Sequence, residues 1–245
     1  MIRTAYLRFE LLRTFRNRRY VLLTFGFPLV LYFLIAAPNR HVQDLGKSGL
    51  SAPLYYMTGL AGFGTMSAML SAGGRIATER STGWNRQLRL TPLTVREYFR
   101  AKILTAYLTA FTSLLLLYLA GTVLGVRLPL HAWLTMTGLI LVGLIPFGAL
   151  AILFGHLLTP DSVGPAMGGA IAILAFLGGT WFPITGGGAM AHIARVLPSY
   201  WLVRASHVAL GGGGWGTTGW LTVAAWTLAL SLFAGRAYRR DTART

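Results

Sequence analysis

The chain has 245 residues, enough for one domain of ordinary size, but its composition is not that of a soluble domain. Apolar residues make up 54 % of the sequence and charged residues only 11 %, less than half the roughly 25 % of globular proteins. A soluble fold of this length could not cover its surface with so few charges. The absence of cysteine excludes disulfide frameworks, thiolate metal sites and cysteine nucleophiles. Composition therefore indicates an integral membrane protein.

The charge balance is strongly basic, with 22 lysines and arginines against 6 acidic residues and a net charge of +16. Such a balance can indicate nucleic-acid binding. Here the basic residues lie between long apolar runs rather than on one soluble face. We therefore expect anionic membrane lipids, and no nucleic acid, as a partner of these residues.

Six uncharged stretches are long enough to cross a hydrocarbon core of about 30 Å, which takes roughly 20 helical residues. A secretory signal peptide is the alternative for the first stretch, but its length and the five stretches that follow favour a membrane anchor. The sequence thus predicts an all-α, polytopic membrane protein with six transmembrane helices in a single domain, 1–245. The stretches are 20–37, 54–74, 103–126, 132–155, 162–185 and 215–235.

The distribution of lysine and arginine predicts the orientation of the chain in the membrane. One side carries 17 of them, in segments 1–19, 75–102 and 236–245, and the other side carries 5. The positive-inside rule then places both termini and the loop 75–102 in the cytoplasm, for a multi-pass protein of the plasma (inner) membrane. The six stretches contain no charged residue, which argues against a proton-coupled transporter with its own relay groups.

The N-terminal segment 1–19 has the pattern of a helix that lies in the membrane surface. Its apolar residues recur at helical spacing, and arginines gather just before the first stretch. Such a helix keeps its apolar stripe in the acyl boundary and its charges in the headgroups. A plain basic anchor is the alternative, for which the arginines alone would suffice. The residues assigned to the interfacial helix are Ile2, Tyr6, Phe9, Leu12, Arg13 and Arg16.

The loop 75–102 predicts a short helix followed by a capped long one. Ser81 or Thr82 can cap a helix of about two turns that ends at Pro92. Thr94 then caps the next helix, with Glu97 three residues later in a capping box.

The short helix carries an apolar face that includes Trp84 and Leu88. Because a two-turn helix is not stable alone in water, we expect this face to dock onto another surface. A solvated basic loop that touches lipid is the alternative.

Segment 183–214 predicts two further short helices, 189–197 and 199–210, on the outer side. They are too short to cross the membrane and too apolar to stand free, so we expect them to dip into the outer leaflet or to cap the bundle. Their basic residues could meet anionic headgroups or substrate, although ordinary interfacial solvation is favoured. These residues are His192, Arg195, Arg204 and His207.

No motif for nucleotide hydrolysis or metal binding is complete. The stretch 41–48 ends in Gly46-Lys47-Ser48, but His41 stands where a phosphate-binding loop needs glycine. The five histidines contain no i, i+4 pair, and the six acidic residues offer no obvious carboxylate pair for hydrolysis. We therefore expect no catalytic site and no cofactor in this chain.

Taken together, these features resemble the permeases of type-2 ABC exporters, a group that includes daunorubicin-resistance-like and polysaccharide- or lipid-export permeases. The resemblance covers essentially the whole chain. It is most specific in Glu79-Arg80 with Gly83, in the run Leu88-x-Leu90-Thr91-Pro92-Leu93, and in Pro198-Ser199-Tyr200 between the outer helices. The family often has Glu or Thr where Trp84 and Asn85 stand here.

The resemblance implies that the short helix after the second span is a coupling helix, seated in a cleft of a separate ABC ATPase subunit. The N-terminal helix would be the connecting helix beside it. ATP and Mg would be bound by the ATPase, and a second permease subunit, identical or closely homologous, would complete the pathway. The residues assigned to ATPase coupling are Glu79, Arg80, Gly83, Trp84, Leu88, Arg89, Leu90 and Pro92.

The implied activity is export of an amphiphilic, drug-like, lipid-like or glycan substrate, as in multidrug or lipid efflux and antibiotic resistance. An adaptable apolar surface on spans two and five would suit such substrates, with simple core packing as the alternative. A membrane-embedded enzyme or lipid-binding protein without an ATPase is the rival interpretation. The residues of the possible substrate path are Tyr55, Tyr56, Met57, Phe63, Met66 and Met69.

Overall fold

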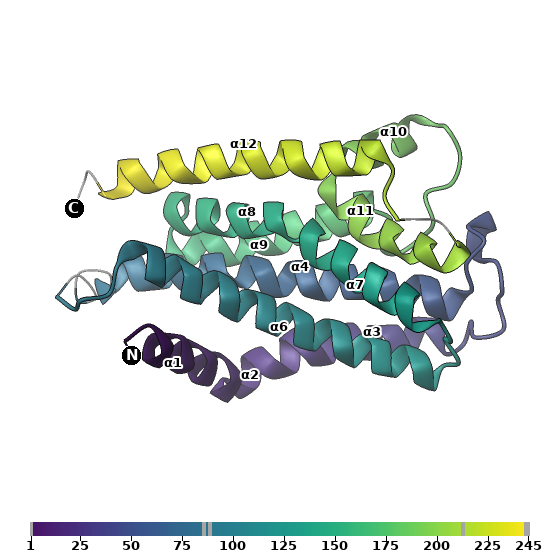
Figure 1. The fold of residues 1–245 in the computed structure, drawn as a ribbon, viewed down its shortest axis with the longest axis horizontal. Coiled ribbons are helices and arrows are strands. Elements are labelled where there is room, and N and C mark those ends of the chain that lie inside the picture. The colour runs from purple at the N-terminus through teal and green to yellow at the C-terminus, as the bar shows by residue number, and fades with distance from the viewer. Residues whose placement is uncertain (1, 85–86, 88–89, 212–213, 243–245) are drawn as a thin grey trace.

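The structure, a computed structural model, describes residues 2–84, 87, 90–211 and 214–242. The regular secondary structure of this part of the chain is helical and includes no strand, so the predicted all-α class is confirmed for it. The long helices lie side by side in an elongated bundle (Figure 1).

The elements follow one another along the chain with short connections. They are α1 (Ile2–Arg16), α2 (Arg18–Val21), the π-helical turn η1 (Leu22–Gly26), α3 (Phe27–Ala36), the 3₁₀ turn η2 (Leu45–Lys47), α4 (Ala52–Ser81), α6 (Val95–Val123), α7 (Leu130–Gly143), α8 (Ile145–Leu157), α9 (Pro160–Leu177), α10 (Ala189–Val196), α11 (Pro198–Arg204), the 3₁₀ turn η3 (Ala205–Leu210) and α12 (Thr217–Thr242).

Five helical stretches of the described chain are long and apolar enough to cross a membrane. The predicted second span corresponds to α4, which is not among these five. Its many glycines, serines and threonines lower its hydropathy, and α3, α6, α8 and α9 pack around it in place of lipid. The count of six therefore remains a prediction. The five stretches are Arg18–Ala36, Val95–Val123, Leu130–Leu157, Pro160–Leu177 and Thr217–Asp241.

Prolines interrupt two of the predicted spans. Pro28 has no N–H to donate to the carbonyl one turn earlier, and the chain widens into the π-helical turn η1 just before it. Pro146 has the same effect at the start of α8, where the chain breaks from α7 at Leu144. The first and fourth spans are thus bent rods, not straight helices.

The predicted fifth span, 162–185, is too long. Helix α9 ends at Leu177, eight residues before the predicted end, because Gly178 and Gly179 turn the chain there and Gly179 has a left-handed φ of 80°. Segment 183–214 then forms the predicted short helix α10, although its location on the outer side remains a prediction. The helix predicted over 199–210 divides into α11 and the tighter turn η3, which ends at Gly211 with a φ of 78°.

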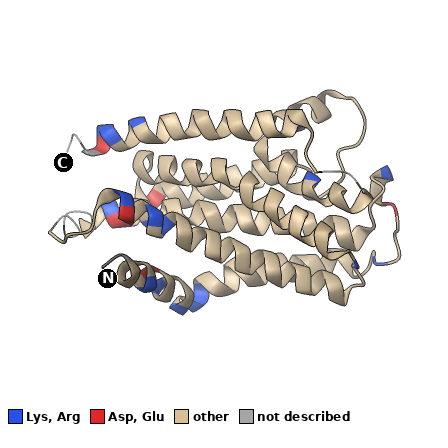
Figure 2. Cartoon of the chain, viewed as in Figure 1, with Lys and Arg blue, Asp and Glu red and all other residues tan. Residues whose placement is uncertain are grey.

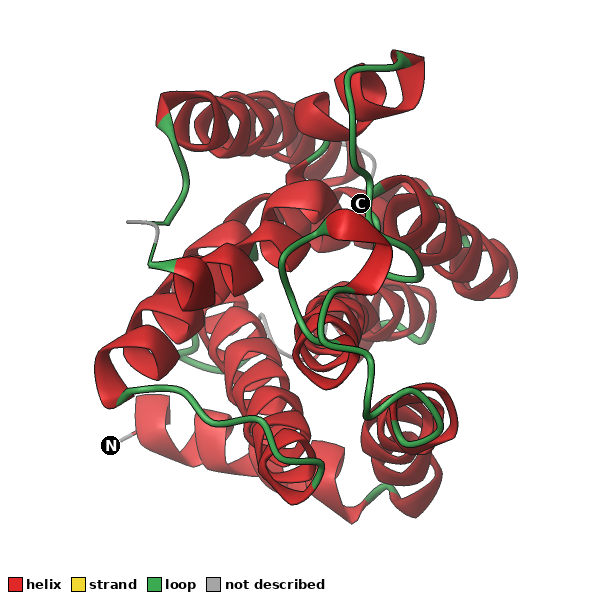
Figure 3. Cartoon of the chain, turned by 90° about the vertical axis from the view of Figure 1, so that its right-hand side faces the viewer, coloured by secondary structure: helices red, strands yellow, loops and turns green. Residues whose placement is uncertain are grey.

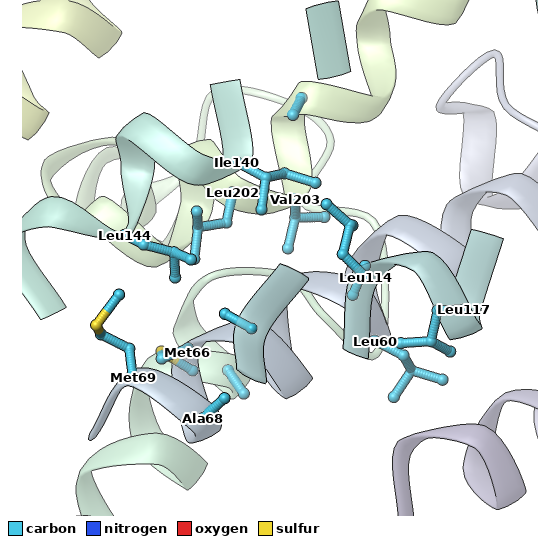
Figure 4. Close-up of a cluster of buried hydrophobic side chains, with 14 of the residues drawn as sticks. Leu60, Met66, Ala68, Met69, Leu114, Leu117, Ile140, Leu144, Leu202 and Val203 are labelled. Carbon is cyan, nitrogen blue, oxygen red and sulfur yellow. The ribbon is translucent and has the colours of Figure 1, made fainter. Parts of the chain in front are cut away.

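Helix α4 forms the centre of the core. Figure 4 shows Leu60, Met66 and Met69 of α4 pointing toward apolar side chains of α6, α7 and α11. Glycines bring α4 and α8 into backbone contact: a Cβ added to Gly73 would lie 2.4 Å from the carbonyl oxygen of Ala151, and one added to Gly155 would lie 2.7 Å from Ile76. Small residues thus serve close packing within the chain, as in other membrane helices.

Charged residues lie at the two ends of the bundle, and the long middle carries none that Figure 2 shows. We call the end that holds α1, the start of α6 and the end of α12 the basic end, and the end that holds α10, α11 and η2 the far end. Both termini lie at the basic end (Figure 1), and α1 crosses it at an angle to the long helices (Figure 3). An uncharged band between two polar ends is the distribution that a bilayer requires.

Candidate functional site

A buried cluster of charges joins three helices at the basic end. Lys102 of α6 is fully buried, and its ammonium Nζ lies 2.8 Å from a carboxylate oxygen of Glu10 and 2.6 Å from one of Glu79. Glu10 belongs to α1 and Glu79 to the last turn of α4, and both carboxylates are also buried. The two acidic residues, 69 positions apart in the sequence, thus share one ammonium, a pairing that the sequence analysis did not predict.

An arginine at the exposed edge of this buried cluster, with its side chain 44 % exposed, and two tyrosines complete it. Arg13 of α1 donates to the Glu79 carboxylate at 2.6 Å, which balances two negative charges with two positive ones. The hydroxyl of Tyr98 donates to the second oxygen of Glu79 at 2.7 Å, and the hydroxyl of Tyr6 donates to Glu10 at 3.3 Å. Burial, followed by the nearby Glu10 carboxylate, raises the pKa of Tyr6, so this phenol remains a hydrogen-bond donor.

The buried cluster fixes the N-terminal helix against the bundle. Removing one partner of a buried ion pair typically costs about 3–5 kcal/mol, because the other charge is left without compensation. A movement of α1 would therefore have to carry α4 and α6 with it. The cluster is thus a mechanical link between α1, α4 and α6.

The next residue, Arg80, forms a second link on the other side of α4. Its guanidinium donates to the backbone carbonyl of His156 at the end of α8 and, at 2.7 Å, to that of Leu158. It also lies 3.5 Å from the carboxylate of Asp241 in α12, whose other oxygen is 3.0 Å from Nδ1 of His156. Glu79 and Arg80 together tie the end of α4 to α1 and α6 on one side and to α8 and α12 on the other.

The remaining residues assigned to coupling lie beyond these links. Gly83 has a left-handed φ of 72°, a backbone conformation that favours glycine, at the turn that follows α4. Trp84 is half-buried, Pro92 is exposed, and Leu90 is 89 % exposed. Leu88 and Arg89 lie outside the described residues. Within the predicted helix of two turns, the described residues Trp84 and Gln87 are helical and Leu90 is in a turn. The docking of this segment remains a prediction.

The predicted capping box at the start of the third span is confirmed. The Thr94 hydroxyl accepts from the Glu97 amide at 3.3 Å, and the Glu97 carboxylate accepts from the Thr94 amide at 2.9 Å. The cap begins α6 eight residues before the predicted span, at Val95. Lys102 is thus the eighth residue of a membrane-length helix, not a loop residue.

The N-terminal helix forms as predicted. Phe9 and Leu12 are exposed along one side of α1, as a stripe that faces lipid requires. Tyr6 and Arg13 instead take part in the buried cluster, and Arg16 is exposed. For Ile2 the structure describes the backbone only. The location of α1 in the membrane surface is still a prediction.

Most residues of the possible substrate path pack inside this chain. Tyr55, Met57, Met66 and Met69 are buried in the core around α4. Tyr56 and Phe63 are half-buried and lie on the side of α4 that also carries Ser67 and Ser71. These two aromatic residues remain the better candidates for contact with a substrate.

At the far end, basic residues from two segments surround one cavity of about 280 Å³. Lys47 of the 37–51 loop, Arg195 of α10 and Arg204 of α11 line it, together with His207 and Tyr200. Lys47 is the one described residue other than glycine with a left-handed φ, 60°. The stretch 41–48 is an irregular loop here, without the strand and helix that flank a phosphate-binding loop.

Acidification should destabilise the chain through His207. Burial, followed by the Arg204 charge, lowers the pKa of this imidazole to about 4 from its ordinary 6.5. Between these values the unfolded chain binds more protons, so stability falls as the pH falls through this window. We expect thermal unfolding at pH 7 and pH 5 to show a smaller acid-induced loss for His207→Asn than for wild type. His131→Asn, at an exposed position, is the control, and equal losses in all three proteins would contradict the assignment.

A helical bundle with an uncharged middle and charged residues at both ends is typical of a polytopic membrane protein. At one end, charged side chains also hold the helices to one another. Comparison with known proteins is more specific. The chain belongs to the ABC-2 family of transporter proteins, whose family model matches residues 33–235. It is similar to a Bacillus subtilis (strain 168) protein described as "Putative transport permease YvfS", with 30 % identity over 196 residues, 78 % of each chain. The resemblance to ABC permeases is thereby confirmed, and the family implies an ABC ATPase partner.

Proposed function

We propose that this permease is the membrane subunit of an ATP-driven exporter that moves an amphiphilic, drug-like, lipid-like or glycan substrate out of the cell. It works as a dimer of permease subunits with two ATPase subunits, which bind ATP and Mg. The observation that carries the proposal is an exposed apolar side chain, Leu90, at the basic end of the bundle.

Leu90 is the most exposed large apolar side chain of the described residues, at 89 %. Many of the other highly exposed ones, such as Leu119 and Val123, lie on membrane-length helices, where lipid would cover them. Val196, at 63 %, lies on the short helix α10 at the far end. Leu90 lies in the loop between α4 and α6, and this loop is at the basic end of the bundle (Figure 1). An apolar anchor in this position fits a pocket on another protein.

The two links at the end of α4 support force transmission from that loop. A displacement of residues 82–94 acts on the last turn of α4, where Glu79 and Arg80 are held. Because these side chains form ion pairs and hydrogen bonds with α1, α6, α12 and the end of α8, these helices would move together with α4. Coupling by this route needs no catalytic residue in the permease.

The outward face of α9 supports a second permease subunit in the membrane. A Cβ added to Gly164 or to Gly168 would meet no atom within 4 Å. This face therefore offers room for the close approach of another helix. The half-buried Tyr56 and Phe63 of α4 would line the path between two such subunits.

The proposed orientation is testable because the chain contains no cysteine. Ser81→Cys and Gly187→Cys introduce single thiols at exposed positions of the basic end and the far end. With the basic end in the cytoplasm, an impermeant maleimide should label Gly187→Cys in intact cells, and it should label Ser81→Cys only after the cells are opened. Labelling of Ser81→Cys in intact cells would reverse the topology.

The function itself is tested by copurification with candidate ABC ATPase subunits from the same genome, followed by ATP-dependent export from inside-out vesicles over a panel of amphiphiles. We expect a stable complex whose ATP hydrolysis responds to a subset of the panel. A permease that binds no ATPase, and whose substrate movement is independent of ATP, would support the rival interpretation of an enzyme or lipid-binding protein.

A further inference from the structure

Two nitrogens of a half-buried guanidinium near the basic end lack a hydrogen-bond partner among the described residues. Nε and Nη2 of Arg75, on α4, are inaccessible to solvent and form no hydrogen bond with any described residue. The guanidinium stacks on the ring of Tyr20 at 5.5 Å, which orients it but does not satisfy its donors. Buried donors in folded proteins nearly always have a partner, and a charged one needs an anion most of all. Arg75 thus points to a group that binds from outside the chain.

Arg75 faces a polar cavity of about 300 Å³ between α4 and the junction of α1 with α2. Arg13, Thr14, Asn17, Ser71 and Thr78 contribute to its lining, and no acidic residue does. The Thr14 hydroxyl is a second buried group without a described partner. The cavity is far larger than the roughly 30 Å³ of a water molecule. Its size, its two guanidiniums and its free hydroxyl fit an oxyanion such as a phosphate ester.

The charge in the cavity is only partly compensated. Arg13 shares the Glu79 carboxylate with Lys102, whereas Arg75 forms no ion pair with a described acidic residue. Exposed Arg16, with the neighbouring Arg18 and Arg19, adds positive potential next to the cavity. A site with this balance selects an anion over a zwitterion.

The surroundings of the cavity indicate that the anion belongs to an amphiphile. Leu22 and Leu23 lie three and four residues after Arg19 and are 69 % and 70 % exposed, near the beginning of a membrane-length stretch. The cavity, lined by Asn17 and Tyr20, therefore lies where the basic segment meets the membrane-length stretch, which is where a lipid headgroup would be expected. A phosphate held there would leave its acyl chains beside the two leucines.

We propose that this cavity is a binding site for one anionic phospholipid, whose phosphate is held by Arg75 and Arg13 and accepts the Thr14 hydroxyl. Planar guanidiniums offer paired donors that match phosphate oxygens. The bound lipid would bridge α1 and α4 beside the buried cluster. The proposal rests on the membrane location of the proposed function and not on ATP-driven transport, so it can fail or succeed independently of the exporter assignment.

The test is lipid binding by the delipidated, full-length permease in detergent, without ATPase, measured by native mass spectrometry and thermal unfolding. Phosphatidylglycerol is the probe, and phosphatidylcholine and soluble glycerol 3-phosphate are the comparison ligands. We expect one phosphatidylglycerol to bind at least tenfold more tightly than further copies and to raise the unfolding temperature. Arg75→Gln should weaken this binding at least tenfold. Arg16→Gln removes the same charge outside the cavity and should weaken it less than twofold.

The variant Arg75→Met tests whether Arg75 binds a ligand or stabilises the fold. Without lipid, this variant should unfold at the same temperature as wild type or above it, because it removes an uncompensated buried charge. It should lose the stabilisation that phosphatidylglycerol gives to wild type. Thr14→Val, nearly equal in size, should weaken binding several-fold without loss of lipid-free stability.

Several results would overturn the proposal. Equal losses in Arg75→Gln and Arg16→Gln would show general attraction to the surface. Equal binding of phosphatidylcholine would exclude recognition of charge, and equally tight, Arg75-dependent binding of glycerol 3-phosphate would identify a soluble anion. An Arg75→Met protein that is destabilised alike with and without lipid would assign the arginine to the fold. Stabilisation of the lipid-free permease by the ATPase, lost in Arg75→Met, would identify a protein partner.

Discussion

Lys102→Met should be the most destabilising single substitution in the charged end of the bundle. It removes the ammonium that lies between Glu10 and Glu79 and leaves two buried carboxylates with only Arg13 to balance them. We expect a loss of about 3–5 kcal/mol, typical of a broken buried ion pair. Thermal unfolding in detergent, followed by tryptophan fluorescence, measures it.

Two further variants show whether the loss comes from charge. Arg100→Met changes an exposed basic residue on the same helix and should stay within about 0.5 kcal/mol of wild type. Lys102→Met combined with Glu79→Gln restores the charge balance and should recover part of the stability. If Lys102→Met unfolds at the same temperature as Arg100→Met, the buried cluster does not hold the helices together.

Leu90→Asp should weaken the complex with the ATPase by about 30-fold or more. This corresponds to the roughly 2 kcal/mol that loss of an interface anchor often costs, at about 1.4 kcal/mol per factor of ten. Trp84→Ala should act in the same direction, since Trp84 lies in the same loop and is only half-buried. The affinity of each detergent-purified variant for the ATPase measures the effect.

The matched control is Val42→Asp, which places the same charge on an exposed apolar residue of the far end. It should bind the ATPase like wild type. Both loop variants should still insert and unfold at the wild-type temperature, because neither side chain belongs to the core. Wild-type affinity in Leu90→Asp and Trp84→Ala would reduce the loop to a basic tether.

Local features of the fold were accessible from the sequence because local chemistry determines them. The capping box of Thr94 and Glu97, for example, depends on residues only three positions apart. The 17-to-5 distribution of basic residues likewise agrees with a bundle whose charges gather at its ends. Errors at this level came from residues that end or bend helices, such as Gly179 and Pro146.

The buried cluster was not accessible in this way. Glu10, Glu79 and Lys102 come from three helices, and each appears in the sequence as an ordinary charge at the edge of an apolar stretch. Burial in a membrane helix is tolerated only because the charges neutralise one another, which depends on the packing of α1 against α4 and α6. One signal was present: Tyr98 and Lys102 are spaced i, i+4 on a helix whose cap had been recognised, which places both on one face.

The possible substrate path shows the opposite difficulty. Methionines and aromatic residues on α4 suit an adaptable binding surface, but the same residues fill a core. Met57, Met66 and Met69 are buried among α6, α7 and α8, whereas Tyr56 and Phe63 are half-buried. Only the three-dimensional structure distinguishes the buried methionines of the core from the half-buried aromatic residues that could contact a substrate.

The central claim is that ATPase-driven motion enters through the loop between α4 and α6. The most direct measurement is site-specific crosslinking in membranes that contain both subunits, with a photoreactive maleimide on single cysteines at Leu90 and, as the control, at Gly187 of the far end. The account predicts a crosslink between position 90 and the ATPase, altered in yield when ATP is added, and no ATPase crosslink from position 187. A crosslink to the ATPase from position 187, or none from position 90 in an assembled complex, would contradict it.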